Sequence, residues 1–338
     1  MQPPKNIHHI SDDSPGITRC FSEAKEPYYL YSDGKSVKNQ KIIVRINSMT
    51  IPPMWKNVWI CANAKGYLQV TGYDAKGRKQ YIYHPAWVKF KQQSKFERLS
   101  TFGEVLPSIR KAIEKDLAQK GWPKSKVLAL VVQLMDNHYL RIGNDYYRQH
   151  NETYGLTTLR RKHLIDDGDE LRFSYKAKSG KYRNIKLKNK SLIKLILATS
   201  ELPGYEVFRY LDRHGKSQKI DSKDVNEYLG QISSESITAK YFRTWGATVM
   251  ALDYYEMAQG DVMQNPRAKL ETAIVKRVAR KLGNTIATCR AYYIHPKVLN
   301  TLVSGNVEQY TLETEEDSSQ SSLSTSEEVV LKIINQTQ

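Results

Sequence analysis

The stretch at residues 288–296, TCRAYYIHP, places two tyrosines side by side. A tyrosine hydroxyl can act as a nucleophile and form a covalent intermediate if its surroundings favour loss of the phenolic proton. Most tyrosines serve packing instead. The pair alone therefore leaves open whether Tyr292, Tyr293 or neither takes part in chemistry.

Three cations lie in settings that suit phosphate binding. Arg141 stands at the end of a long apolar stretch, in LRIG, beside a glycine that lets backbone approach a ligand closely. Lys240 and Arg243 lie one turn apart at the start of another expected helix, in ITAKYFRTWGATV. Two arginines can clamp a phosphate through paired hydrogen bonds. Each of these residue types, taken alone, is more often a surface residue.

A fourth cation, Lys178, lies near the tip of an expected hairpin, LRFSYKAKSGKYRNIKL. Phe173, Tyr175 and Ala177 alternate on the inward face of this hairpin, and SG forms its turn. A lysine at such a tip can swing to donate a proton to a leaving oxygen. The alternative is a lysine that only keeps a strand edge soluble.

An earlier hairpin, YLQVTGYDAKGRKQYIYH, carries aromatic and basic residues together. Its two-residue period places Lys79, Tyr81 and Tyr83 on one face, beside Arg78. Such a face can bind phosphates and sugars. A solvated edge strand would have the same pattern.

The composition favours a polyanionic partner. The 338 residues include 52 Lys and Arg against 35 Asp and Glu, a net charge of +17. Residues 311–338 hold six acids and one lysine, so this segment carries −5 and the rest of the chain carries +22. A body that is so basic and that includes most of the 22 tyrosines is expected to bind nucleic acid. Charge alone names no reaction.

Several classes of protein are not indicated. Cys20, Cys61 and Cys289 lack a CxxC spacing, so neither a disulfide framework nor a zinc site is expected. No apolar run approaches the roughly 18 residues of a membrane span, and the first residues do not resemble a secretory signal. A reducing intracellular compartment is expected, namely the cytoplasm or nucleoid if the source is bacterial. No nucleotide-binding P-loop pattern is present.

The elements that must position these residues predict an α+β fold with two domains. Residues 1–28 are expected to be a flexible lead-in, 29–95 a small β-rich domain, 96–310 a larger, mostly helical domain, and 311–338 a disordered, acidic, Ser-rich tail. Strands are expected at 41–46, 58–62, 67–73 and 79–84. Helices are expected at 106–121, 126–143, 191–199, 223–231, 238–257 and 268–282.

Taken in order, Arg141, Lys178, Arg243 and Tyr293, with GRKQYIYH upstream, resemble the type IB DNA topoisomerases, particularly the compact bacterial and poxvirus-like group. The similar stretches are LRIGNDYY…NETYGLTTLRRKH, FSYKAKSGK, TAKYFRTWGAT and LGNTIATCRAYYIHP. They extend from about residue 51 to 297, and they leave residues 1–40 and the acidic tail uncovered.

The resemblance implies which tyrosine reacts. In the family, the nucleophile lies nine residues after the polar residue of the LG-N/H-T turn, which is Asn284 here, so the count reaches Tyr293. Tyr292 then serves packing or DNA contact. The implied reaction is transient cleavage of one DNA strand through a 3′-phosphotyrosyl link, followed by religation. This reaction relaxes positive and negative supercoils without ATP, metal or another cofactor.

The resemblance also implies roles for the other residues. Arg141 and Arg243 would stabilise the charged transition state, and Lys178 would protonate the departing 5′-oxygen. Asn284 stands where poxvirus and nuclear members have histidine and would donate a neutral hydrogen bond to the phosphate; alternatively, it only caps the next helix. The expected partner is double-stranded DNA, held by a monomer that acts as a clamp. The residues expected to contact DNA are Arg78, Lys79, Tyr81, Tyr83, Tyr147, Lys240 and Arg290.

Two alternatives remain. Tyrosine recombinases share the catalytic fold and the Arg–Lys–Arg–Tyr order, but they usually have His-x-x-Arg where this chain has Lys240-x-x-Arg243. An inactive DNA-binding relative would lack part of the reactive set, whereas all of its positions are filled here.

Overall fold

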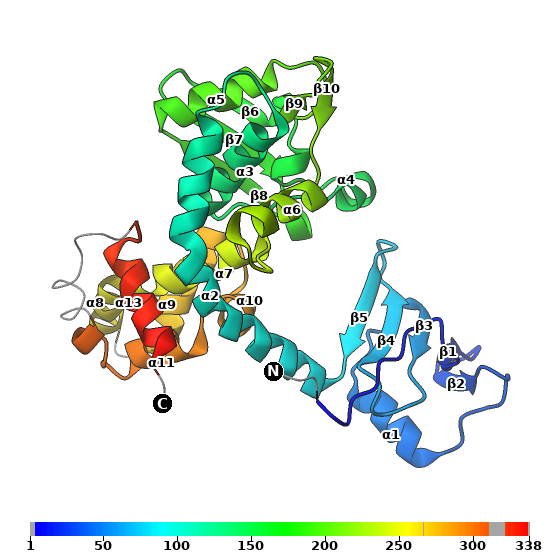
Figure 1. The fold of residues 1–338 in the computed structure, drawn as a ribbon. Coiled ribbons are helices and arrows are strands. Elements are labelled where there is room, and N and C mark those ends of the chain that lie inside the picture. The colour runs from blue at the N-terminus through cyan, green and yellow to red at the C-terminus, as the bar shows by residue number, and fades with distance from the viewer. Residues whose placement is uncertain (1–3, 266, 311–321, 337–338) are drawn as a thin grey trace. The chain divides into compact units, whose positions relative to one another are not determined.

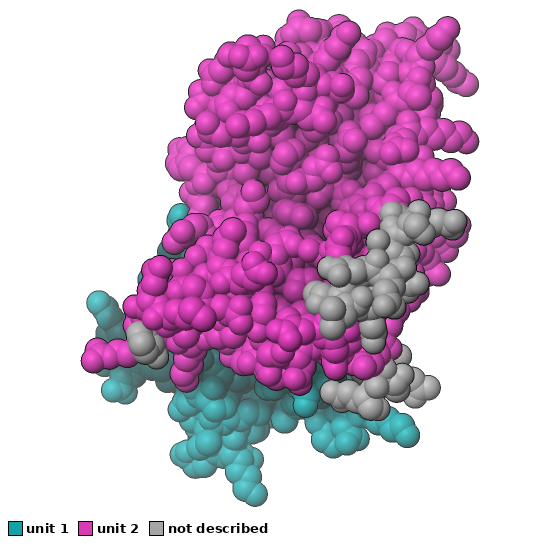
Figure 2. Space-filling model, turned by 90° about the vertical axis from the view of Figure 1, so that its left-hand side faces the viewer, with its two compact units in different colours: residues 1–97 teal, residues 98–338 magenta. Residues whose placement is uncertain are grey.

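The chain forms two compact units, residues 1–97 and 98–338, coloured separately in Figure 2. The computed structural model describes residues 4–265, 267–310 and 322–336. The first unit is built on a β-sheet and the second is mostly helical, which confirms the expected α+β fold class. Helix α2 (Pro85–Leu117) runs from the first unit into the second, so the limit expected at residue 95 falls inside a helix.

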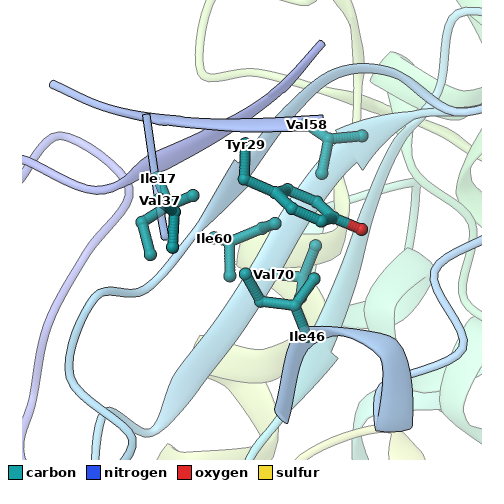
Figure 3. Close-up of a cluster of buried hydrophobic side chains, with 7 residues drawn as sticks. All are labelled: Ile17, Tyr29, Val37, Ile46, Val58, Ile60 and Val70. Carbon is teal, nitrogen blue, oxygen red and sulfur yellow. The ribbon is translucent and has the colours of Figure 1, made fainter. Parts of the chain in front are cut away.

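The first unit contains a five-stranded sheet with the order β2-β1-β3-β4-β5, and all of its neighbouring strands are antiparallel. A cluster of buried side chains packs between this sheet and helix α1 (Gln40–Ser48), as Figure 3 shows. The cluster consists of Ile17, Tyr29, Val37, Ile46, Val58, Ile60 and Val70. The strands are β1 (Ile17–Phe21), β2 (Pro27–Tyr31), β3 (Lys56–Ile60), β4 (Leu68–Tyr73) and β5 (Lys79–Tyr83).

Two expectations for this unit were wrong. The lead-in expected at 1–28 contains β1, which pairs with β2 and β3 and buries Ile17 completely. The strand expected at 41–46 is helix α1, although its β-branched residues favour a strand. The side chain of Asn39 caps this helix, and Ile42, Ile43 and Ile46 share the face that packs on the sheet. Tertiary packing therefore overrides the local preference.

The second unit is mostly helical (Figure 1). The helix expected at 126–143 is α3 (Lys124–His138), and the segment expected as one helix at 238–257 is divided between α7 (Lys240–Asp253) and α8 (Tyr255–Gln264). The remaining helices are α4 (Asp145–Asn151), α5 (Lys190–Ser200), α6 (Ser222–Ser233), α9 (Leu270–Leu282), α10 (Ile286–Tyr292), α11 (Pro296–Val303) and α13 (Thr325–Asn335).

Helix α7 is the central helix of the second unit. Every residue from Tyr241 to Ala251 is buried, because α3, α8, α9, α11 and α13 all pack against α7. The large aromatic side chains of Phe242 and Trp245 anchor it in the core. Polar groups of α7 consequently hold fixed positions in the unit.

Short strands complete the second unit. β7 (Leu171–Lys176) and β8 (Tyr182–Leu187) form the expected hairpin, and Phe173, Tyr175 and Ala177 are buried as the alternation predicts. β6 (Leu164–Asp166) extends this sheet, and β9 (Arg209–Leu211) pairs with β10 (Ser217–Lys219).

The segment expected as a disordered acidic tail contains a helix. Residues 311–321 lie outside the described residues, but α13 follows them and packs on α7 and α11. Ser324 and Glu327 form a capping box at its start, and Val329, Val330 and Ile333 are buried. The acidic composition of the tail hid this apolar face. None of the described helices is long and apolar enough to cross a membrane.

Candidate active site

The two adjacent tyrosines lie in different environments. Tyr293 is half-buried at the end of α10, whereas 45% of Tyr292 is exposed. The hydroxyl of Thr248, on α7, accepts the N–H of His295 at 3.1 Å and lies 3.4 Å from the Tyr293 carbonyl oxygen. Tyr293 is therefore attached on its C-terminal side to the central helix, while Tyr292 faces solvent.

Arg243 lies directly beside Tyr293. It is 5% exposed, and its Cζ lies 5.3 Å from the centre of the Tyr293 ring. Its Nη1 donates to the carbonyl oxygen of Tyr139 and its Nη2 to that of Leu282 at 3.1 Å. Among the residues that the structure describes, no carboxylate pairs with Arg243, and its Nε has no hydrogen-bond partner. The guanidinium is thus fixed by neutral acceptors and keeps its charge for an anion.

Arg141 is joined to Asn284 across the site. Arg141 follows the end of α3 by three residues, and its carbonyl oxygen accepts the N–H of Leu156 at 2.9 Å. Its Nη2 donates to Oδ1 of Asn284 at 2.6 Å. The amide Nδ2 of Asn284 is buried without a partner in the described part of the chain. Thr285, and not Asn284, caps α10, since its side chain accepts the N–H of Thr288.

The two arginines shift the pKa of Tyr293. Burial raises this pKa, but the charges and hydrogen bonds of Arg243 and Arg141 outweigh burial, so the pKa lies below the usual value of a phenol. Burial and the charge of Arg141 in turn lower the pKa of Arg243 to about 10. The site therefore favours added negative charge, whether on the phenol or on a bound phosphate.

Lys178 is more exposed than these residues. It is exposed at the tip of the β7–β8 hairpin, where Ser179 and Gly180 form the turn with φ of 67° and 73°. No hydrogen bond or ion pair links its side chain to other residues within the described ranges. The structure thus brings together Arg141, Arg243, Asn284 and Tyr293, and it leaves Lys178 on an exposed hairpin.

Three of the expected DNA-contacting residues of the first unit, Lys79, Tyr81 and Tyr83, alternate along β5 and share one face, and Arg78 directly precedes this strand. The rings of Tyr81 and Tyr83 stack with centres 6.0 Å apart, and Nζ of Lys79 lies 5.8 Å from the centre of the Tyr81 ring. Both tyrosines are exposed. The two cations already have acidic partners: Lys79 pairs with Asp12 at 2.6 Å, and Arg78 pairs with Asp74 at 2.6 Å.

The remaining expected contacts lie on separate helices. Tyr147 is exposed on α4, and Lys240 is exposed at the first position of α7 with its Nζ near the Tyr241 ring. Arg290 pairs with Glu271 at 2.6 Å, which ties α10 to α9.

Sequence reasoning missed Tyr139, whose carbonyl oxygen holds Arg243. Tyr139 adopts φ of 54° at the end of α3, and its ring packs against Gly246. A Cβ at Gly246 would lie 2.0 Å from the Tyr139 ring, so only glycine fits there. The available signal in the sequence was Gly246, three positions after Arg243, because a glycine inside a helix can mark the close approach of another side chain. Within the described residues, no three His, Cys, Asp or Glu side chains gather as metal ligands would.

Known families match most of the chain. Residues 84–318 match the catalytic core of eukaryotic DNA topoisomerase I, and residues 28–74 match the N-terminal domain of bacterial DNA topoisomerase IB. The chain is 30% identical over 290 residues to DNA topoisomerase 1B of Acanthamoeba polyphaga mimivirus, which covers 82% of this chain and 85% of that protein. It is 24% identical over 237 residues to DNA topoisomerase 1B of Vaccinia virus (strain Copenhagen), which covers 70% and 72%.

Among solved structures, the XerH site-specific recombinase bound to its difH substrate aligns with a TM-score of 0.34 and 17% identity, over 61% of this chain and 53% of that one. A score this low bears on neither fold nor function. The family matches are decisive, because one of them spans more than half of the chain and the other covers part of the β-rich unit. The chain belongs to the type IB DNA topoisomerase family.

Proposed function

We propose that this chain relaxes positive and negative supercoils by breaking and resealing one strand of duplex DNA through Tyr293. The observation that carries the proposal is the meeting of Arg141, Arg243 and Asn284 around one half-buried tyrosine. Membership of the type IB topoisomerase family supports the same activity.

In the cleavage step, Oη of Tyr293 attacks a backbone phosphorus in line with the bond to the 5′-oxygen. The new bond joins the phenolic oxygen to phosphorus, and the bond between phosphorus and the 5′-oxygen breaks. The phenol loses its proton, and the departing oxygen gains one to become a hydroxyl. Religation reverses each change. One phosphodiester replaces another of similar energy, so no nucleotide hydrolysis is required.

The two arginines are proposed to stabilise the transition state. Negative charge gathers there on the non-bridging phosphate oxygens, and preorganised donors in a half-buried site bind such charge strongly. Within the described residues, Nε of Arg243 and Nδ2 of Asn284 have no hydrogen-bond partner, so each can add a hydrogen bond without breaking an existing one. Loss of one donor of this kind typically slows a reaction ~10²–10³-fold.

Lys178 is proposed as the general acid. Its exposed position at a hairpin tip would let it reach the 5′-oxygen when DNA is bound, and proton transfer of this kind is worth roughly 10²–10⁴-fold in rate. This role is supported by the family resemblance, and the side chain would have to move to a bound substrate.

The first unit is proposed to clamp the duplex as part of a monomer. The exposed Tyr81 and Tyr83 and the nearby Lys79 offer stacking and phosphate contacts. To bind DNA, Lys79 and Arg78 would exchange their present carboxylate partners for phosphates. Tyr147, Lys240 and Arg290 are proposed as further contacts to DNA. The proposed site of action is the intracellular compartment that contains the DNA.

The proposal is tested by relaxation of plasmid DNA. Negatively and positively supercoiled plasmids should both relax without ATP and in excess EDTA, because the proposed donors are all side chains. The absence of relaxation of either sign, or a strict need for a recombination site, would contradict the proposal. The affinity for DNA should fall steeply with salt, since many phosphate contacts release counterions.

A further inference from the structure

The carboxyl end of α9 is held by three arginines from different parts of the second unit. Arg183, on β8, donates from Nη2 to the carbonyl oxygen of Lys281 at 3.1 Å. Arg243, on α7, donates to the carbonyl oxygen of Leu282 at 3.1 Å. Arg141 donates to Oδ1 of Asn284 at 2.6 Å. Two of these arginines belong to the proposed site, and Arg183 does not.

The need for these donors follows from how α9 ends. The last carbonyls of a helix have no partner within it, and they form the negative end of its dipole. Here Gly283 takes the left-handed conformation with φ of 66°, and the N–H groups of Gly283 and Asn284 reach back to carbonyls of Arg280 and Ala279. The carbonyls of Lys281 and Leu282 remain, and Arg183 and Arg243 each take one.

Arg183 also lies against the turn itself. A Cβ built on Gly283 would come within 2.4 Å of Nη1 of Arg183, so the guanidinium fills the space that a side chain would occupy. Burial lowers the pKa of Arg183, and the charge of Arg141 lowers it further, which agrees with a partly desolvated position near the site. Arg183 therefore touches the residues immediately before Asn284.

We propose that Arg183 is a positioning residue for cleavage, which fixes the 281–284 turn so that Asn284 presents its amide to the phosphate. Arg183 also connects this turn to the hairpin whose tip carries Lys178, five residues earlier in the chain. The inference rests on the proposed function of Asn284 and Tyr293. In this role Arg183 itself contacts no reacting atom.

A competing role would be direct contact with DNA. Arg183 lines a basic cavity of about 680 Å³ together with Lys186, Arg277, Arg280 and Lys281. A phosphate bound there would make Arg183 an affinity residue. The two roles predict different effects of an Arg183 substitution on DNA affinity, on the salt dependence of that affinity, and on the loss of rate caused by Asn284→Ala.

The test is single-turnover cleavage of a DNA duplex at saturating enzyme, scored as covalent adduct, with DNA affinity measured at several salt concentrations. Arg183→Gln should slow cleavage roughly 10- to 100-fold, as loss of a residue that orients a reactive group does. The affinity and its salt slope should stay unchanged. Lys186→Gln removes a charge from the same strand and the same cavity, and it should cleave at the wild-type rate.

Coupling to Asn284 provides the sharper readout. If Arg183 acts through the turn, Arg183→Gln should slow cleavage little further in an Asn284→Ala background, because residues in one network are not additive. Arg183→Lys retains one donor and should recover part of the rate. If thermal unfolding shows that Arg183→Gln does not fold, the double-mutant cycle is measured with Arg183→Lys instead. Arg183→Lys should slow cleavage in the wild-type background and should slow it no further in the Asn284→Ala background.

Three results would overturn the inference. Arg183→Gln could cleave as fast as Lys186→Gln, its effect could multiply fully with that of Asn284→Ala, or it could weaken binding and reduce the salt slope by about one phosphate contact. Tyr293→Phe is run in the same assay. If that variant still forms adduct, the proposed function itself fails, which is a different outcome from failure of Arg183 alone.

Discussion

The guanidinium of Arg243 lies over the ring of Tyr293, with Cζ 5.3 Å from the ring centre. Both residues are linked to the central helix α7, since Arg243 belongs to it and Thr248 of that helix contacts the backbone around Tyr293. Because every residue of α7 from Tyr241 to Ala251 is buried, this relationship has little freedom to change. The cation therefore acts on the phenol before any substrate arrives.

The pH dependence of cleavage should show this effect. Arg243 and Arg141 lower the pKa of Tyr293, so their loss raises it. If cleavage requires the phenol to lose its proton, the rate rises with pH through that pKa. Arg141→Gln should therefore move the rising limb to higher pH, besides slowing cleavage ~10²–10³-fold. Single-turnover rates between about pH 6 and about pH 10 would measure the shift.

The control for this prediction is Arg213→Gln, which removes a charge from an exposed arginine outside the site. Its pH profile should match that of the wild type. An unshifted limb in Arg141→Gln would show that Arg141 does not act on Tyr293.

Alanine substitutions at Asn284 and Thr285 should have different effects, one on the cleavage rate and the other on stability. Asn284→Ala should lower the cleavage rate ~10²-fold through loss of its amide donor, with little change in stability. Thr285→Ala should lower the stability and leave the cleavage rate nearly unchanged. Thr285 caps α10, and loss of such a cap costs about 1 kcal/mol. Adduct formation and chemical denaturation would be measured for both variants. Normal cleavage by Asn284→Ala would remove Asn284 from the site.

Asn284→His should retain much of the wild-type rate, because imidazole can donate the same hydrogen bond. This variant should also gain a pH dependence near ~6.5, where histidine titrates. A rate as low as that of Asn284→Ala would mean that the position requires the amide.

Lys178→Ala should slow cleavage by about 10²–10⁴-fold on ordinary DNA. A substrate with sulfur at the 5′-bridging position should restore the rate, since a thiolate leaves without a proton. Lys181→Ala, on the other side of the same exposed tip, is the matched control and should cleave both substrates normally. Failure of the sulfur substrate to rescue Lys178→Ala would assign the proton to another group, and Lys176 or Lys181 would be examined next.

Helix α13 should stabilise the catalytic unit. Glu327 is 7% exposed, pairs with Arg110 at 2.8 Å and accepts the indole N–H of Trp245 at 3.1 Å. Glu327→Gln weakens the pairing of this buried position with the half-buried Arg110 and should lower the free energy of unfolding by about 1–3 kcal/mol. Urea denaturation would measure the loss. Glu328→Gln, at the adjacent residue, should change stability by less than about 0.5 kcal/mol. Equal losses in the two variants would show that the pair of Glu327 and Arg110 is not the cause.

The sequence allowed the fold class and both hairpins to be predicted, because strict alternation and turn residues specify them locally. It misplaced the segment 41–46, where β-branched residues form α1 because Asn39 caps them and the sheet covers one face. The tail was also expected to be disordered throughout, because its acidic composition obscures the apolar residues on one face of α13. These errors share a cause, which is burial against segments distant in the chain.

The residues of the candidate site could be predicted only in part from the sequence. Arg141, Arg243 and Tyr293 could be identified as a set through the family resemblance, and the structure places Arg243 and Arg141 where they lower the pKa of Tyr293. The carbonyl of Tyr139 that holds Arg243 could not be predicted, because backbone acceptors have no sequence signature. Arg183 was hidden for the same reason, since its partner is the carbonyl of Lys281.

Tyr293, and not the adjacent Tyr292, should become covalently linked to DNA. The most direct measurement is denaturing-gel detection of the covalent protein–DNA adduct for Tyr293→Phe and Tyr292→Phe, with DNA affinity measured in parallel. Tyr293→Phe should form no adduct and bind DNA normally, whereas Tyr292→Phe should form the adduct at a substantial fraction of the wild-type rate. Adduct formation by Tyr293→Phe, or loss of the adduct only in Tyr292→Phe, would show that Tyr293 is not the nucleophile.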